Sequence, residues 1–163
     1  DLKIINVTTA NEMFNKVKQL LPTDIAICVA AVSDFKPKLK NKNKIKKDNN
    51  EFKSIAVEKN PDILEFLGKN NKHRPSLVIG FAAETEDVIK NSLNKLKNKN
   101  CDMIIANDVT KNDTGFNSNF NEVFLIDAKG VSEKITKNKK SYIASVLTKK
   151  ILNKFLINDK NLN

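Results

Sequence analysis

The sequence has few of the residues on which several common kinds of functional site depend. Its 163 residues contain one histidine, His73, and two cysteines, Cys28 and Cys101. One imidazole and two separated thiols do not make a zinc site of the usual kind. Both cysteines lie inside apolar runs, so we expect buried thiols without a disulfide, as in proteins of a reducing compartment.

Glycine is also scarce, and this limits the ways in which the chain could bind a nucleotide. The four glycines form neither a Gly-x-Gly-x-x-Gly sequence nor a Walker loop. A nucleotide must therefore find partners for its phosphate charges elsewhere, and lysine side chains are the remaining option.

Long apolar runs are absent as well. No stretch of 18 apolar residues occurs, which argues against a membrane span, and no signal peptide is visible. A chain of this length is expected to form one cytoplasmic domain, residues 1–163, with a sizeable core. It begins with Asp1 just before an apolar segment, which suggests part of a longer or a processed polypeptide.

Positive charge is abundant, but its distribution is not typical of a nucleic-acid reader. The net charge is +10, yet Arg74 is the one arginine, and lysines are spread over many segments without interleaved aromatic residues. Proteins that read nucleic acids favour arginine and aromatic side chains. We therefore expect no nucleic-acid partner and keep that class as an alternative.

Short apolar runs alternate with amphipathic segments along the chain. Strands are expected at 2–7, 24–32, 51–59, 76–84 and 101–109, with a hairpin inside 122–135. Helices are expected at 10–21, 60–70, 87–100 and 141–156. In the second of these, Asn60 is the expected N-cap, Pro61 the first helical residue and Gly68 the residue that closes the helix. The run 24–32 lacks alternation, which suits a parallel strand covered on both faces. The pattern predicts an α/β fold: a Rossmann-like, mostly parallel sheet with helices on both faces, plus the hairpin and a mobile basic flap at 36–50.

Polar residues follow three of the expected strands. Ser33 and Asp34, Glu84 and Thr85, and Asn107 and Asp108 each come after small residues such as Ala30 and Ala31. Ligands of open α/β sheets bind outside the carboxyl ends of the strands, so a crevice is expected there; solvated strand ends are the alternative. Lys95 and Lys99 share one face of the following helix, either as anion ligands or as a solvated face.

An ordered set of motifs then points to a family. "AAVSDFKP", "KIKK", "KNPDIL", "GFAAETED", "KLKNKNCDMIIANDV" and "GFNSNFNEV" occur in this order. Together they resemble the phosphopantothenate–cysteine ligases of coenzyme A biosynthesis, which in many bacteria form the C-terminal half of a bifunctional protein. The resemblance implies a reaction in which CTP activates 4'-phosphopantothenate as an acyl-cytidylate, and the amine of L-cysteine then displaces CMP. It also implies a homodimer, with Mg²⁺ accompanying CTP and FMN bound only if a decarboxylase domain is attached.

The resemblance also implies roles for individual residues. Lys44 would be the catalytic lysine, on a flap that closes over the triphosphate. Lysines and Mg²⁺ suit this chemistry because attack of one anion on another needs charge neutralisation. The metal ligands are not defined. The residues implied to bind CTP are Ala30, Asp34, Lys44, Asn60, Pro61, Asp62, Ile63, Phe81, Lys95 and Lys99.

One part of the family pattern is not found. The family begins with a Gly-rich strand–turn–helix and a segment like "ITNxSSGKMG", whose asparagine is expected to hold the acyl-cytidylate. Neither occurs in this sequence. The domain is therefore expected to be N-terminally incomplete, without the first strand and helix of its sheet, and inactive by itself unless that part is supplied. A noncatalytic nucleotide-binding or nucleic-acid-binding domain is the alternative function.

Overall fold

The computed structural model describes residues 2–39, 54–70, 72–110 and 118–160. The chain divides into two compact units, which are described separately below. The smaller unit comprises Asp1–Gln19 and Ala31–Asp62, and the larger one comprises Leu20–Ala30 and Ile63–Asn163.

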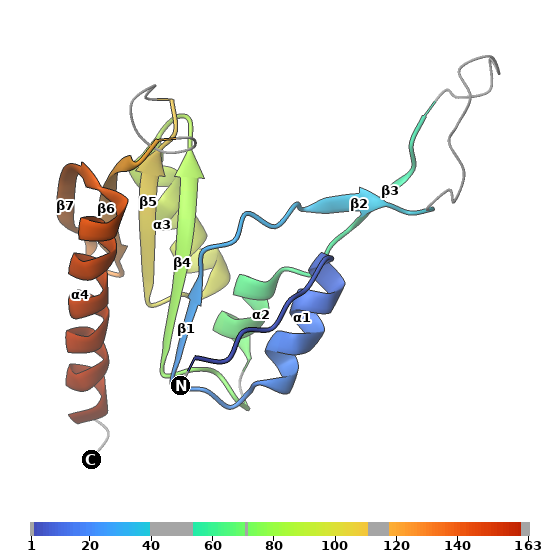
Figure 1. The fold of residues 1–163 in the computed structure, drawn as a ribbon, viewed down its shortest axis with the longest axis horizontal. Helices are drawn as coiled ribbons and strands as arrows, with labels where there is room; N and C mark the ends of the chain where they lie inside the picture. The colour runs from blue at the N-terminus through green and yellow to red at the C-terminus, as the bar shows by residue number, and fades with distance from the viewer. Residues whose placement is uncertain (1, 40–53, 71, 111–117, 161–163) are drawn as a thin grey trace. The chain divides into compact units, whose positions relative to one another are not determined.

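The larger unit is built on a five-stranded sheet (Figure 1). Its first three strands in spatial order run parallel, and the last two form an antiparallel hairpin. In that order the strands are β1 (Ile25–Cys28), β4 (Leu77–Glu84), β5 (Met103–Asp108), β6 (Phe120–Asp127) and β7 (Gly130–Lys139). The expected α/β fold with a mixed, mostly parallel sheet and a C-terminal hairpin is confirmed.

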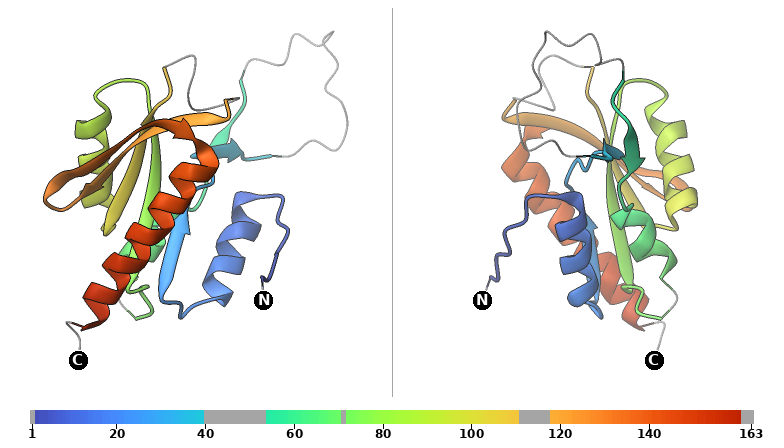
Figure 2. Two further views of the ribbon diagram at one scale, coloured as in Figure 1. Left: turned by 60° about the vertical axis from the view of Figure 1, so that its left-hand side comes forward. Right: turned by 90° about the vertical axis from the view of Figure 1, so that its right-hand side faces the viewer.

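Helices cover both faces of this sheet (Figure 2). On one face lies α4 (Lys140–Lys160), whose buried Ile143, Leu147 and Ile151 join the same apolar cluster as Leu77 and Ile105 of the sheet. On the other face lie α2 (Ile63–Lys69) and α3 (Val88–Lys99). Successive strand residues point to opposite faces, so a continuous apolar run such as 77–82 can bury both sides of a central strand.

The strand at 24–32 differs from its prediction. Pairing extends only over Ile25–Cys28, and among the described residues β1 is an edge strand with β4 as its single neighbour. Ile27 is 48% exposed and Val29 is 61% exposed, so this run is not covered on both faces. An apolar run fits a central strand, but burial on both faces also requires neighbouring elements.

Neither cysteine is part of a disulfide; Cys101 is buried, as expected, whereas Cys28 is half-buried. Burial, followed by the nearby Cys28 and Asp102, raises the pKa of the Cys101 thiol to about 12. Cys101 therefore belongs to the core as a protonated, unreactive thiol. None of the helices in the described ranges has the length and apolar character needed to cross a bilayer.

The smaller unit contains α1 (Ala10–Gln19) and a two-stranded antiparallel sheet of β2 (Phe35–Pro37) and β3 (Val57–Lys59). A reciprocal cap starts α1: Thr8 donates its backbone N–H to the Glu12 carboxylate, and Glu12 donates its own N–H to Thr9 Oγ1. The hydrogen bonds from the backbone N–H and the hydroxyl of Thr8 to this carboxylate lower the pKa of Glu12.

Two strand predictions in the smaller unit need correction. Residues 2–7 form no strand, and Leu2 is 89% exposed, because this segment has no ladder partner among the described residues. The strand expected at 51–59 is limited to Val57–Lys59, with 51–53 outside the described residues. Of the flap expected at 36–50, Lys36 and Pro37 belong to β2, and 40–50 lie outside the described residues.

Candidate functional site

The two lysines predicted to bind phosphate lie on the side of α3 that faces β4 and α2. Lys95 Nζ donates a hydrogen bond to the carbonyl of Phe81 at 3.1 Å. Lys99 Nζ lies 3.0 Å from Oε2 of Glu65 on α2. Side chains of a helix lean toward its N-terminus, so residues four apart stack along one face. The predicted shared face is confirmed, and it is half-buried rather than fully solvated.

Glu65 connects these lysines to α2. Its Oε1 accepts from Lys69 Nζ at 2.6 Å, while its Oε2 faces Lys99. Hydrogen bonds from Lys69 and Lys99 lower the pKa of Glu65 to about 2. We call Glu65, Lys69, Lys95 and Lys99 the amine cluster. Glu65 was not singled out from the sequence, because 34 residues separate it from Lys99.

A single glycine allows α2 to approach the end of α3. A Cβ atom added to Gly68 would lie 1.9 Å from the carbonyl oxygen of Lys99 and 2.8 Å from that of Asn100. Gly68 is inside α2 and does not end it, and the helix begins at Ile63 rather than at Pro61, so Asn60 is not its N-cap. The capping pattern correctly predicts that a helix begins in this segment, but the predicted first residue is two positions too early.

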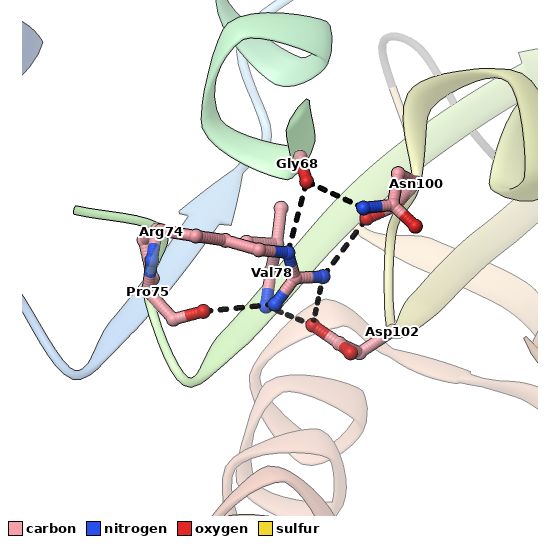
Figure 3. Close-up of polar contacts among 6 residues, drawn as sticks. All are labelled: Gly68, Arg74, Pro75, Val78, Asn100 and Asp102. Carbon is pink, nitrogen blue, oxygen red and sulfur yellow. Dashed lines mark hydrogen bonds and ion pairs between the residues drawn. The ribbon is translucent and has the colours of Figure 1, made fainter. Parts of the chain in front are cut away.

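Arg74 ties this junction together (Figure 3). Its guanidinium donates to the carbonyls of Gly68, Pro75 and Asn100 and to Oδ2 of Asp102, each at 2.9 Å. The planar group carries five donors in a fixed geometry, which suits several acceptors at once. The single arginine of the chain thus joins α2 and α3 to the amino ends of β4 and β5.

The acceptors around Arg74 are themselves bonded. Asp102 Oδ2 also accepts the backbone N–H of Val78 at 2.7 Å. Asn100 adopts the left-handed conformation that ends α3 (φ 54°), and its Nδ2 donates to the Gly68 carbonyl at 2.7 Å. This network stabilises the spacing between α2 and α3, on which the amine cluster depends.

At the opposite edge of the sheet, the polar strand ends of β4 and β5 meet as predicted. Glu84 and Asp108 are partners in the parallel register. Asp108 Oδ1 accepts both the backbone N–H and the hydroxyl of Thr110, at 2.9 Å and 2.6 Å. The third predicted strand end, Ser33 and Asp34, belongs to the smaller unit.

A shallow cavity of about 400 Å³ lies at this edge, between the start of α3 and the hairpin. Its wall combines both charge signs, and one pair is already formed, Lys134 with Glu122 at 3.2 Å. The sequence predicts a crevice at this edge and names Asp108, but it does not predict the rest of the wall, which comes from separate segments. The wall is formed by Asp87, Val88, Ile89, Lys90, Asp108, Glu122, Phe124 and Lys134.

Three further residues predicted to bind CTP, Ala30, Ile63 and Phe81, lie in the larger unit. Phe81 is half-buried, and its ring packs with the apolar cluster on the α4 face, so its carbonyl rather than its ring meets Lys95. Ile63 is 8% exposed in the first turn of α2. Ala30 is exposed just beyond β1.

The other predicted residues lie in the smaller unit or outside the description. Asn60 donates its backbone N–H to the Asp34 carbonyl and its Nδ2 to the Ser33 carbonyl, each at 2.8 Å. Its Oδ1 is buried without a hydrogen-bond partner in the described part of the chain. Pro61 is half-buried and Asp62 exposed. Lys44, the predicted catalytic residue, lies outside the described residues.

A protein-only metal site does not occur in the described ranges. No three His, Cys, Asp or Glu residues there come together in a way that could hold a metal ion. Magnesium usually binds through one or two carboxylates plus substrate phosphates. The described residues therefore fit Mg²⁺ only as an ion that arrives with a polyphosphate.

The fold and the amine cluster define a Rossmann-like α/β domain with a cationic face that can hold an anion. Comparison with known families agrees. The chain belongs to the family described as DNA/pantothenate metabolism flavoprotein, C-terminal domain, which matches residues 1–155. The family-level resemblance drawn from the motifs is confirmed.

Individual relatives are longer proteins. A coenzyme A biosynthesis bifunctional protein CoaBC from Borreliella burgdorferi is 37% identical over 150 residues, covering 91% of this chain and 37% of the relative. A cysteine/cysteine sulfinic acid decarboxylase from an unknown prokaryotic organism is 37% identical over 153 residues, covering 93% of this chain and 42% of that protein. The chain thus spans less than half the length of these curated relatives.

A solved structure supports the fold directly. The crystal structure of the C-terminal domain of a CoaBC protein superimposes with a TM-score of 0.68 at 32% identity, covering 90% of this chain and 63% of that one.

Proposed function

We propose that the chain is the larger part of a CTP-dependent phosphopantothenate–cysteine ligase domain acting in coenzyme A biosynthesis. Family membership and the CoaBC relatives support the pathway. The observation that carries the proposal is the pair Lys95 and Lys99, whose amines are directed to one side of α3 by the fold.

The proposed chemistry assigns binding and charge neutralisation to these residues. The carboxylate of 4'-phosphopantothenate attacks the α-phosphate of CTP, pyrophosphate leaves, and the amine of L-cysteine then displaces CMP from the acyl-cytidylate. Lys95 and Lys99 would reduce the repulsion between the two anions in the first step. Lys44 would add a further amine, and Mg²⁺ bound with CTP would neutralise its phosphates.

The family resemblance implies that the segment from Asn60 to Ile63 recognises the cytosine base through its backbone groups. Asn60 is held by its contacts with Ser33 and Asp34, and its Oδ1 is a buried acceptor without a partner in the described residues. A buried unpaired acceptor is costly, so a donor such as the exocyclic amine of cytosine would be favourable there. We further propose a cytoplasmic homodimer; FMN would be relevant only with an attached decarboxylase domain.

Calorimetry with Mg²⁺ and CTP tests the nucleotide step. Lys95→Ala should weaken CTP binding about tenfold, since it removes a charge-assisted bond to phosphate. Lys97→Ala is the matched control, because Lys97 is exposed on the same helix, and it should change the affinity less than about twofold. Equal affinity of the wild type and Lys95→Ala for CTP would contradict the assignment.

A nucleic-acid-binding domain is the second candidate, and the net charge of +10 favours it. It predicts binding of any oligonucleotide with a steep dependence on salt concentration. Tighter binding of CTP than of ATP, with little affinity for oligonucleotides, would exclude this candidate.

A further inference from the structure

Glu65 holds the place in the amine cluster that an anion would take. Each of its carboxylate oxygens faces one ammonium group, Lys69 at 2.6 Å and Lys99 at 3.0 Å. Lys95, one turn before Lys99 on α3, is bonded instead to the neutral carbonyl of Phe81. Of Lys95 and Lys99, the latter therefore has the charged acceptor.

The backbone around Glu65 fixes its distance from Lys99. Gly68, three residues later in α2, leaves no room for a Cβ atom against the Lys99 carbonyl. Arg74 and Asn100 both donate to the Gly68 carbonyl. Because α2 is held against the end of α3, Glu65 cannot move away with its helix when a ligand approaches Lys99.

The carboxylate also remains charged under ordinary conditions. The pKa of Glu65 is lowered to about 2, chiefly by the bonds from Lys69 and Lys99. Moderate acidification therefore does not release Lys99. A ligand phosphate can contact Lys99 in two ways: it displaces the Glu65 carboxylate, or it binds beside that negative charge. Both weaken the binding of the phosphate.

We propose that Glu65 is a positioning residue that restrains Lys99 in the ligand-free protein and lowers the affinity of the amine cluster for phosphate groups. The inference rests on the proposed function, because it takes Lys99 to be a ligand of the CTP phosphates. A carboxylate in this place would lower the affinity for highly charged ligands more than that for weakly charged ones, and it would ease release of the nucleotide after the reaction.

The test measures CTP binding, with Mg²⁺ present, by calorimetry on the 163-residue chain. Glu65→Gln should tighten CTP binding about two- to fivefold, the range for partly exposed charge pairs. Glu133→Gln is the matched control: it also removes one negative charge that is paired with a lysine, on β7. This control should leave the affinity unchanged, and neither variant should alter the affinity for cytidine, which has no phosphate.

A double-mutant cycle separates positioning from a general charge effect. If Glu65 acts through Lys99, the tightening caused by Glu65→Gln should disappear in a Lys99→Ala background. The same tightening in that background, or equal or weaker CTP binding by Glu65→Gln in the wild-type background, would overturn the proposal.

Binding of inorganic tripolyphosphate distinguishes failure of the Glu65 proposal from failure of the proposed CTP-dependent function. If the wild type binds tripolyphosphate but not CTP, the CTP assignment fails, and the same variants measured with tripolyphosphate still decide the role of Glu65. If neither anion binds, both proposals are wrong. Thermal melts should show that Glu65→Gln remains folded, since the Glu65 side chain itself is 39% exposed.

Discussion

Arg74 and the pair Lys95 and Lys99 of α3 lie on the same side of the sheet, but the protein holds them differently. Arg74 donates to three backbone carbonyls as well as to Asp102. A ligand cannot displace those carbonyls without moving the chain. Lys99 is bonded to a side-chain carboxylate and Lys95 to one carbonyl. The acceptors of a cation, more than its charge, therefore indicate whether it is structural or available to a ligand.

The largest effect on this comparison is expected from a substitution that separates α2 from the end of α3, the two places that Arg74 joins. Gly68→Ala should destabilise the protein by about 3 kcal/mol, because its Cβ would overlap the Lys99 backbone carbonyl. Denaturant unfolding measures the loss. Gly80→Ala is the control: its Cβ would meet the side-chain ends of Leu64 and Ile104, which can rearrange. Equal losses at the two glycines would contradict the proposed rigidity of the α2–α3 junction.

The next test exchanges one cation for another. Arg74→Lys should lower the free energy of unfolding by about 2 kcal/mol, because an ammonium group cannot reproduce the set of hydrogen bonds to Gly68, Asn100 and Asp102. At a temperature below its melting temperature, the Arg74→Lys variant should lose less CTP affinity than Lys95→Ala does. A large loss of CTP affinity with unchanged stability would place Arg74 among the ligand-binding residues and end the comparison.

The sequence allowed prediction of elements whose signals are local. The central strands, the face shared by Lys95 and Lys99, and the hairpin follow from apolar periodicity and turn residues over short windows. Predictions failed where an element depends on its neighbours. Residues 2–7 are apolar but have no ladder partner among the described residues, and the run at 24–32 pairs on one side only.

The same reason explains what was missed at the candidate site. Spacing identified Lys95 and Lys99, but their acceptors lie 14 and 34 residues away in the chain. The acceptors of Arg74 on α3 and β5 are similarly distant, at 26 and 28 residues. Such partners are set by the packing of α2 on α3, which depends on the absence of a side chain at Gly68 rather than on any repeating pattern.

The smallest expected effect concerns a polar group on this same side of the sheet that belongs to neither network. Ser92 of α3 is fully buried, and its hydroxyl has no hydrogen-bond partner within the described residues. Ser92→Ala removes this unsatisfied group and improves helix propensity, so it should stabilise the protein by about 0.5–1 kcal/mol. Denaturant unfolding of the purified variant would measure this gain.

Ser145→Ala on the exposed face of α4 is the control, because it changes helix propensity without changing a buried hydroxyl. The difference between the two variants isolates the cost of burying the Ser92 hydroxyl. If Ser92→Ala instead destabilises the protein, the hydroxyl donates to a backbone carbonyl of α3, as serine side chains in helices can. Ser92 would then resemble Arg74, a polar group held by the backbone, and would extend the structural region further along α3.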